Sequence, residues 1–385
     1  MQSAKRKFPV WALILIDIFL LAICLSVFCY FHHIRDIWGS IIVDESAPEI
    51  TEPPLMVITR PPRPSQVTVT TTTPDIDPTP DNDPPSDPDI STPDPKPVTT
   101  EKVPEVTVPP LDTSGDFGYL HAEKFAQGDE IIRTEEDGVK IYQSHDVYIE
   151  MKEVVTQLEQ ATKQGGAIKT TTVRYCLEDI YVRNIDNLFT SYSSGNKSFN
   201  SLLEGTNSIV AISGDVFNLS TEFKPIVIRN GNVIRKADSI KLDICALYWD
   251  GTMETITPSE YSWDKLLAKA PYQVWSFGPE LLNDDGSPKS IASHSLWEPH
   301  PRSAIGYVEP GHYVLLVVDG QRGSNGTGTG INLDALAKIL SEAGCKQAYN
   351  LDGGTSVYGY YDGEMTVYFD KYRKISDIIC IGEIG

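Results

Sequence analysis

The sequence is short of positive charge and lacks several common catalytic and metal-binding motifs. It has 32 Lys and Arg residues against 53 Asp and Glu residues, and the formal net charge is -21. This balance argues against nucleic acid as a partner, because phosphate backbones bind basic surfaces. No GxSxG, HExxH or CxxC run is present, so the sequence signatures of serine hydrolases, zinc proteases and CxxC zinc sites are missing.

Cysteine is also scarce. Two of the six cysteines, Cys24 and Cys29, lie in an apolar N-terminal stretch. The others allow three disulfide pairings, among which the sequence does not choose, and free buried thiols are an equal alternative. These others are Cys176, Cys245, Cys345 and Cys380. No cofactor is expected: clustered carboxylates can bind a divalent cation, but no EF-hand spacing supports a metal site.

The N-terminal residues predict a membrane anchor. Residues 8–31 are apolar except for Asp17, and they follow the basic run Lys5-Arg6-Lys7. A bilayer needs roughly 20 apolar residues, whereas a cleaved signal has a core of about 7–15 followed by small residues; CYFHH follows here. We therefore expect a cytoplasmic tail (1–7), an uncleaved transmembrane anchor (8–34) and an extracellular remainder, which describes a single-pass protein of the cell membrane.

The next segment, residues 35–110, predicts a disordered linker. It contains stretches such as TVTTTTPDIDPTPDNDPPSDPDISTPDPKP, with almost no large apolar residues. Such a composition does not bury enough surface to offset the entropy of ordering. Proline and repelling aspartates favour a semi-rigid spacer of about 3.1 Å per residue.

The remaining residues predict a lead-in segment (111–164) and one large domain (165–385). β-rich runs alternate with few helical patterns, which favours an α+β fold around a large mixed, mostly antiparallel sheet with a few packed helices. Asn230-Gly231 and Asp250-Gly251 lie between apolar runs and predict hairpins.

Helical patterning marks three segments of this region. Helices are expected at residues 263–269 and 333–343, with Gly344 ending the second. Residues 147–162, which contain EMKEVVTQLEQAT, predict a surface helix.

Three apolar runs end in Asp and Gly: SIVAISGDVFN, HYVLLVVDGQR and KQAYNLDGGTS. One Asp-Gly after a strand is more often an ordinary turn, as expected at Asp250 and Asp362. Three in one domain favour a shared site, because a sheet fixes strand ends rigidly and glycine lets a ligand approach the backbone.

Two further features fit an anionic ligand. Arg302, in HPRSAIGYV, offers bidentate donors for phosphate, although an ordinary surface or ion-pairing arginine is the simpler alternative. The glycine-rich residues 323–340 lead into a helix and predict an anion cradle or, alternatively, a lid. Paired carboxylates suit glycoside cleavage, and an arginine beside them suits a charged leaving group, so the pattern predicts cleavage at a sugar–phosphate linkage.

Several runs, in the same order along the chain, resemble the phosphodiester glycosidase family. They are SGDVFN (213–218), WSFGPELL (275–282), PRSAIG (301–306), VVDGQR (317–322), AYNLDGGTS (348–356) and RKISDII (373–379). The resemblance covers roughly residues 165–385. It implies an α+β domain that hydrolyses a sugar 1-phosphodiester, releasing the sugar and leaving a phosphomonoester.

The resemblance also suggests roles for individual residues. Asp352 and Asp319 are the expected catalytic pair, and Arg302 is expected to bind phosphate. The other expected substrate-binding residues are Asp215, Asn350, Gly353, Gly354, Ser356, Arg322 and Gly278. Two positions depart from the family pattern: Ser213 replaces the usual Asn, and the inserted Gln321 displaces Arg322.

We therefore predict an extracellular, membrane-anchored hydrolase acting on a phosphodiester-linked glycan of the cell envelope or an exopolysaccharide. Its expected partners are that sugar-phosphate substrate and the membrane; the sequence gives no oligomeric state. The alternatives are a non-catalytic glycan-binding or cell-wall module, and a glycosyl transferase using the same site.

Overall fold

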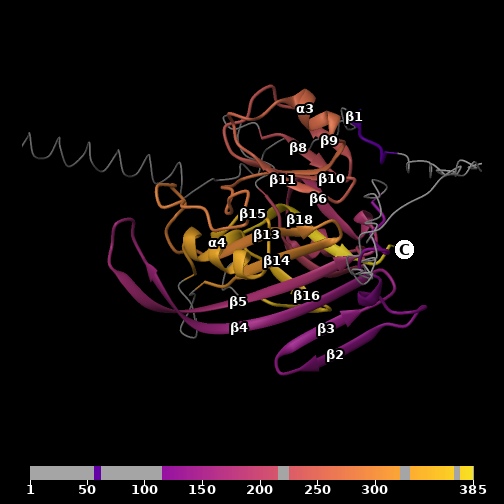
Figure 1. Cartoon of the computed structure of the whole chain (residues 1–385), viewed down its shortest axis with the longest axis horizontal. Coiled ribbons are helices and arrows are strands. Elements are labelled where there is room, and N and C mark those ends of the chain that lie inside the picture. The colour runs from indigo at the N-terminus through magenta and orange to yellow at the C-terminus, as the bar shows by residue number, and fades with distance from the viewer. Residues whose placement is uncertain (1–55, 62–114, 216–224, 321–329, 368–372, 385) are drawn as a thin grey trace, which may run out of the picture.

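The computed structural model describes residues 56–61, 115–215, 225–320, 330–367 and 373–384 (Figure 1). Within these ranges the chain forms three sheets, and all strand pairs in them are antiparallel. The prediction of mostly antiparallel β-structure with few helices is confirmed. The prediction of one large mixed sheet is wrong, because the strands form three separate hydrogen-bonded sheets and none of their described pairs is parallel.

The largest sheet has seven strands and holds two of the three Asp-Gly strand ends. Its order is β15 (Gln347–Asn350), β13 (Arg302–Glu309), β14 (His312–Val318), β5 (Ile168–Val182), β4 (Val147–Ala161), β3 (Val139–Gln143) and β2 (Ile132–Glu136). Strands β4 and β5 form the long hairpin in the lower half of Figure 1, above β3 and β2. The predicted boundary at residue 164/165 therefore lies in the turn of this hairpin.

The other two sheets have six and five strands. The six-stranded order is β1 (Met56–Val57), β9 (Asn232–Arg235), β8 (Val227–Arg229), β12 (Pro271–Ser276), β10 (Ile244–Tyr248) and β11 (Met253–Ile256). The five-stranded order is β17 (Glu364–Met365), β16 (Gly359–Tyr361), β7 (Ser208–Ser213), β18 (Ile375–Gly382) and β6 (Leu188–Lys197). Both predicted hairpins are confirmed, as β8–β9 and β10–β11.

The helices in the described ranges are short. They are α2 (Phe199–Leu203), α3 (Trp263–Ala268) and α4 (Leu333–Glu342), with 3-10 turns η1 (Ala122–Lys124), η2 (Ile185–Asn187) and η3 (Gly354–Ser356). The predictions of α3 and α4 are confirmed. Asn332 caps α4 by accepting from the Ala335 amide over 2.9 Å, and Gly344 follows with a φ of +84°, the left-handed conformation that glycine favours.

The helix predicted over residues 147–162 is wrong, because this segment is strand β4. Every residue from Val147 to Ala161 pairs with a residue of β5. Its first half alternates in burial, with Val147, Ile149 and Met151 facing the core. The burial of side chains repeats every two residues, and the partner strand β5 is rich in β-branched residues; both features favour a strand. They outweigh the helix propensity of the Glu, Lys, Leu and Gln residues in this segment.

The main core joins all three sheets and includes residues from β4, β7 and β12, such as Ile149, Val210 and Trp275. A second cluster packs α4 against β13 and β14. Glu178 on β5 is an ionisable residue that is 0% exposed, and neither carboxyl oxygen has a hydrogen-bond partner among the described residues. Burial raises the pKa of Glu178 well above its ordinary value, because the charged form loses its hydration.

The predicted membrane anchor, residues 8–34, lies outside the described residues. Among the residues described, no helix has the length and apolar character needed to cross a membrane. Most of the predicted linker is also outside them, but residues 56–61 are described and contain β1, so this part of it is ordered against β9. The four cysteines of the domain are buried and unpaired, which decides between the alternatives left open above.

Candidate active site

Three strand termini meet at one edge of the seven-stranded sheet. Strand β13 lies between β14 and β15 and is antiparallel to both. Its first residue, Arg302, pairs with Val318 at the end of β14, and Ala304 pairs with Asn350 at the end of β15. The residues that follow β14 and β15 therefore lie on either side of the start of β13. Their backbones are about two strand spacings (~10 Å) apart across the sheet.

Asp352 follows β15 and is held by its own turn and by one arginine. Its Oδ1 accepts from the Gly353 amide over 2.9 Å, and its Oδ2 accepts from Arg373 Nη2 over 2.5 Å. Burial raises the pKa of Asp352, whereas Arg373, Ser356 and the Gly353 amide act to lower it. The result is a mostly buried carboxyl next to a cation whose side chain is 32% exposed.

Asp319 follows β14 and has an analogous arrangement. Its Oδ1 accepts from the Gly320 amide over 2.7 Å, and its Oδ2 lies 3.2 Å from Arg174 Nη1. Burial raises the pKa of Asp319 as well, against the effect of the Gly320 amide and Arg174. Arg174 also binds Glu153 over 2.8 Å, so it is shared between two carboxylates.

Pro301 joins the two turns. A Cβ on Gly320 would lie 2.2 Å from Pro301 Cγ, and one on Gly353 would lie 2.8 Å from the Pro301 carbonyl oxygen. The Gly354 amide donates to that same carbonyl over 3.0 Å. The structure thus brings Asp319 and Asp352 together around one proline, as the sequence predicted, and the glycines are needed for the close approach.

Asp215, after β7, lies in a buried ionic cluster that the sequence did not reveal. Arg229 Nη2 is 2.7 Å from both Asp215 Oδ1 and Asp377 Oδ2, and all three side chains are 0% exposed. The Ser276 amide donates to Asp215 Oδ2 over 2.6 Å. Burial, with the Asp215 carboxylate, raises the pKa of Asp377 to about 8. Both Asp215 oxygens therefore contact protein groups, which favours a positioning role; sugar binding by Asp215 stays a prediction.

This ionic cluster is connected to Asp352 through Gly214. The Gly214 amide donates to the Asp377 carbonyl over 3.2 Å, and the Gly214 carbonyl accepts from the Asp352 amide over 3.1 Å. Beside it, the Ser213 and Ser303 hydroxyls lie 2.7 Å apart. Ser213, which replaces the usual Asn of the family pattern, thus bonds β7 to β13 directly.

Arg302, which was predicted to bind phosphate, is buried and contacts backbone carbonyls. Its guanidinium donates to the Leu296, Glu298 and Ile331 carbonyls, at 2.5, 2.6 and 3.2 Å, and the residue is 2% exposed. Burial lowers the pKa of Arg302 to about 9, but the guanidinium remains charged at neutral pH. These contacts fix the loop before β13; phosphate binding by Arg302 stays a prediction.

The remaining predicted residues lie around Asp352. Asn350 Nδ2 donates to the Gly278 carbonyl over 2.7 Å, whereas Asn350 Oδ1 is buried without a partner among the described residues. Ser356 is fully buried in η3. Arg322 and residues 323–329 of the predicted anion-binding segment lie outside the described residues. Over the described part of the chain, no group of three His, Cys, Asp or Glu side chains is placed to hold a metal.

The sequence reasoning did not nominate Arg373, Arg229 or Asp377. Arg229 and Asp377 carry a signal in retrospect, because each is a lone charge inside an apolar strand, in PIVIRN and ISDIIC. Arg373 is the first residue of the RKISDII run quoted above, to which no role was assigned. It reaches Asp352 because its backbone is held by the Thr355 carbonyl (3.2 Å) and by Tyr358, whose hydroxyl donates to the Arg373 carbonyl (2.8 Å).

These features define a three-sheet β domain with a buried acidic and cationic site at its strand ends. Residues 206–382 match the model of the phosphodiester glycosidase family, and this part of the chain is a phosphodiester glycosidase family domain. The match includes all the motifs quoted above, so the resemblance is confirmed.

Two relatives are similar in sequence. An SPbeta prophage-derived uncharacterized protein, YomE of Bacillus subtilis (strain 168), is 30% identical over 172 residues, which is 42% of this chain and 26% of YomE. N-acetylglucosamine-1-phosphodiester alpha-N-acetylglucosaminidase of Bos taurus is 33% identical over 91 residues, which is 21% of this chain and 16% of that enzyme. The chain thus spans about a quarter or less of the relatives it matches.

Similarity to a solved structure was also found. The zebrafish N-acetylglucosamine-1-phosphodiester alpha-N-acetylglucosaminidase catalytic domain, auto-inhibited by its pro-peptide, has a TM-score of 0.48 and 19% identity. The comparison covers 61% of this chain and 84% of that one.

Proposed function

We propose that this domain hydrolyses the bond between the anomeric carbon of a sugar and a phosphodiester oxygen. The products are the free sugar and a phosphomonoester. The observation that carries the proposal is the Asp352–Arg373 pair, a buried carboxyl 2.5 Å from a guanidinium with an exposed part. A glycosyl phosphodiester needs both groups: a carboxylate at the anomeric carbon and a cation at the departing phosphate.

The surroundings of the pair support a ligand with many oxygen atoms. Asn350 Oδ1 and Arg373 Nε are buried polar atoms without partners among the described residues. Buried polar groups are normally paired, so a bound ligand is a reasonable source of their missing partners. A substrate phosphate that accepts from Arg373 would also weaken its hold on Asp352 and release that carboxylate to react.

The arginine and the two carboxylates have different roles in the proposed reaction. Phosphate monoesters are good leaving groups, so protonation of the leaving oxygen matters less than stabilisation of its developing charge. Arg373 is placed for that electrostatic role, and Asp352 and Asp319 are the candidates for nucleophile or base. The substrate class we propose is a GlcNAc-1-phosphodiester-like linkage in a cell-envelope glycan or exopolysaccharide, met by a domain that is anchored to the membrane and extracellular.

The direct test is turnover of paired substrates by the full chain. GlcNAc-1-phosphomethyl ester should be hydrolysed, and the methyl glycoside without phosphate should react far more slowly. Asp352→Asn should lower kcat by about 10²–10⁴-fold. Asp362→Asn is the matched control: Asp362 also precedes a glycine after a strand, but it pairs with Arg133 at the surface.

The outcomes separate the alternatives. Binding of the phosphodiester without turnover would favour a glycan-binding module, and a new conjugate formed with added glycan acceptors would favour a transferase. Full activity of Asp352→Asn would remove Asp352 from the mechanism.

A further inference from the structure

An N-terminal segment, residues 56–61, is docked on the six-stranded sheet although residues 62–114 separate it from the rest of the domain. Met56 and Val57 pair with Val233 and Asn232 at the edge of β9. The Ile58 amide donates to the Gly231 carbonyl over 2.7 Å. In Figure 1, β1 lies beside β9 at the upper right.

The contacts of this segment extend beyond strand pairing. Ile58 is 8% exposed, and its carbonyl accepts from Trp249 Nε1 over 3.0 Å. A Cβ on Gly231 would lie 2.6 Å from the same carbonyl, so only glycine at this turn admits the segment. Main-chain pairing at a sheet edge together with a buried side chain is the usual way in which a protein recognises an extended peptide.

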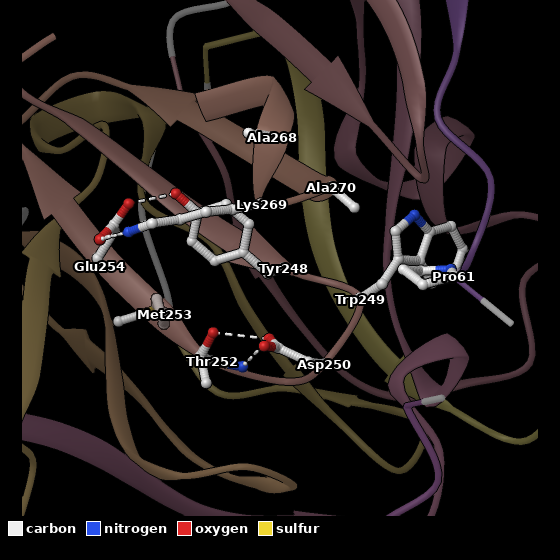
Figure 2. A pocket seen from close by; sticks show the side chains of 10 residues that line it. All are labelled: Pro61, Tyr248, Trp249, Asp250, Thr252, Met253, Glu254, Ala268, Lys269 and Ala270. Atoms are coloured by element: carbon white, nitrogen blue, oxygen red, sulfur yellow. Dashed lines mark hydrogen bonds and ion pairs between the residues drawn. The ribbon is translucent and has the colours of Figure 1, made fainter. Parts of the chain in front are cut away.

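Arg60 adds specificity. It donates to Asn184 Oδ1 over 2.9 Å and forms an ion pair with Asp186. Its guanidinium carbon lies 5.1 Å from the centre of the Trp249 ring. The next residue, Pro61, lines a pocket of about 500 Å³ together with Trp249, Tyr248 and Lys269 (Figure 2). None of the predicted active-site residues lines this pocket.

The other end of the intervening segment returns to the same place. Asp116 forms a bridge with Asn184, the Phe117 amide donates to the Arg183 carbonyl over 2.6 Å, and the Ile185 amide donates to the Gly115 carbonyl over 2.8 Å. Residues 56–61 and residues 115–117 are therefore both held by residues 183–186.

We propose that residues 56–61 are a strap recognised by a peptide-binding surface of the domain, made of β9, Gly231, Trp249, Asn184 and Asp186. Its occupant is the chain's own segment. Among the described residues, the first docked point of the chain is then Met56 and not Gly115, and Asn184 lies beside both anchored ends. Docking within one chain requires little affinity, because a linker of this length gives an effective concentration on the order of millimolar.

Hydrogen–deuterium exchange on the full chain tests the strap. The Ile58 amide should be protected, and Arg60→Ala should accelerate its exchange about tenfold, from the combined loss of the ion pair and the cation–π contact. Arg133→Ala, which removes a surface arginine paired with Asp362, is the control and should leave the rate unchanged. Exchange of Ile58 at the rate of an unprotected amide, or an equal rate in Arg60→Ala, would overturn the proposal.

A second measurement uses the receiving surface. Asp186→Ala should raise Ile58 exchange less than Arg60→Ala does, because it removes the ion pair but leaves the contact of Arg60 with Trp249. The double variant should exchange like Arg60→Ala, because both changes remove the same ion pair. Additive effects would show that Arg60 and Asp186 are not partners.

Light scattering decides whose segment is bound. Protection that is independent of protein concentration in a monomer supports docking within the chain. A dimer that dissociates in Arg60→Ala would overturn this assignment and place the strap on a second copy.

Discussion

Arg373 Nη2 donates to Asp352 Oδ2 over 2.5 Å at the end of β15, and the two side chains come from segments 21 residues apart. Asp352 is fixed by the Gly353-Gly354 turn, whereas the described contacts of Arg373 are those of its backbone with Thr355 and Tyr358 and the bond of its guanidinium to Asp352. The carboxylate is therefore the rigid member of the pair, and the guanidinium is the member that can turn toward a ligand.

Replacing Arg373 should separate charge recognition from sugar recognition. Arg373→Ala should lower kcat/KM for a sugar 1-phosphodiester by about 10²–10³-fold, as for loss of one charge-stabilising donor. An uncharged glycoside, if it reacts, should be affected far less. Arg133→Ala, which removes a surface arginine, is the control. Equal losses for both substrates would argue against contact between Arg373 and the phosphate.

The same variant should change the pH profile. Burial raises the pKa of Asp352 and Arg373 lowers it, so removal of Arg373 should raise that pKa further. If Asp352 reacts as a carboxylate, the acidic limb of kcat/KM should move to higher pH in Arg373→Ala. A profile whose acidic limb does not move would assign that limb to another group.

Gly320→Ala should disturb both strand ends at once. The new Cβ would lie 2.2 Å from Pro301 Cγ, and relieving that overlap should cost about 1–3 kcal/mol in the free energy of unfolding. Activity should fall as Pro301 shifts, because the Asp352 turn is bonded to the Pro301 carbonyl. Gly195→Ala is the control, since no atom lies within 4 Å of its added Cβ. Unfolding in urea and turnover of the same samples provide the measurement.

Arg229→Met should destabilise the domain strongly. It would leave the Asp215 and Asp377 carboxyls buried without their cation, at a cost of about 3–5 kcal/mol. Arg133→Met removes an ion pair whose arginine side chain is 51% exposed, and it should cost about 1 kcal/mol or less. Urea titrations of the two variants compare the costs directly, and equal costs would contradict the buried charge network.

Glu178 should make folding stability decrease as the pH rises. Its pKa is raised in the folded state, so its contribution is fully retained below the unfolded pKa of about 4.3. Above that pH the unfolded chain loses the proton first, and stability falls by up to about 1.4 kcal/mol per pH unit toward the folded pKa. The titratable side chains that interact with Glu178 are Cys176 and Tyr361.

Glu178→Gln should remove this pH dependence. The difference in unfolding free energy between the variant and the native chain should move in favour of the variant from pH 5 to pH 8. Glu159→Gln, on the exposed part of β4, is the control. A constant difference across this range would show that Glu178 is already ionised in the fold.

Local patterns in the sequence predicted the hairpins and helices well, because Asn-Gly, Asp-Gly and capping signals act over a few residues. They failed at β4, where helix-forming residues become a strand through pairing with β5, a contact that no local window contains. The meeting of Asp319 and Asp352 was predictable from three similar strand ends. The positions of Arg373 and Arg302 were not, since each depends on which carbonyls and carboxylates the folded loops bring near.

The return of the chain to Asn184 has a mechanical consequence. A pulling force applied N-terminal to Met56 is carried first by the two pairs of β1, the Ile58 hydrogen bonds and the Arg60 ion pair. Only after these contacts rupture does the load reach Gly115 and Asp116. The strap is therefore the first part of the described chain to bear such a load, and the tension at which its contacts break decides when force reaches the rest of the domain.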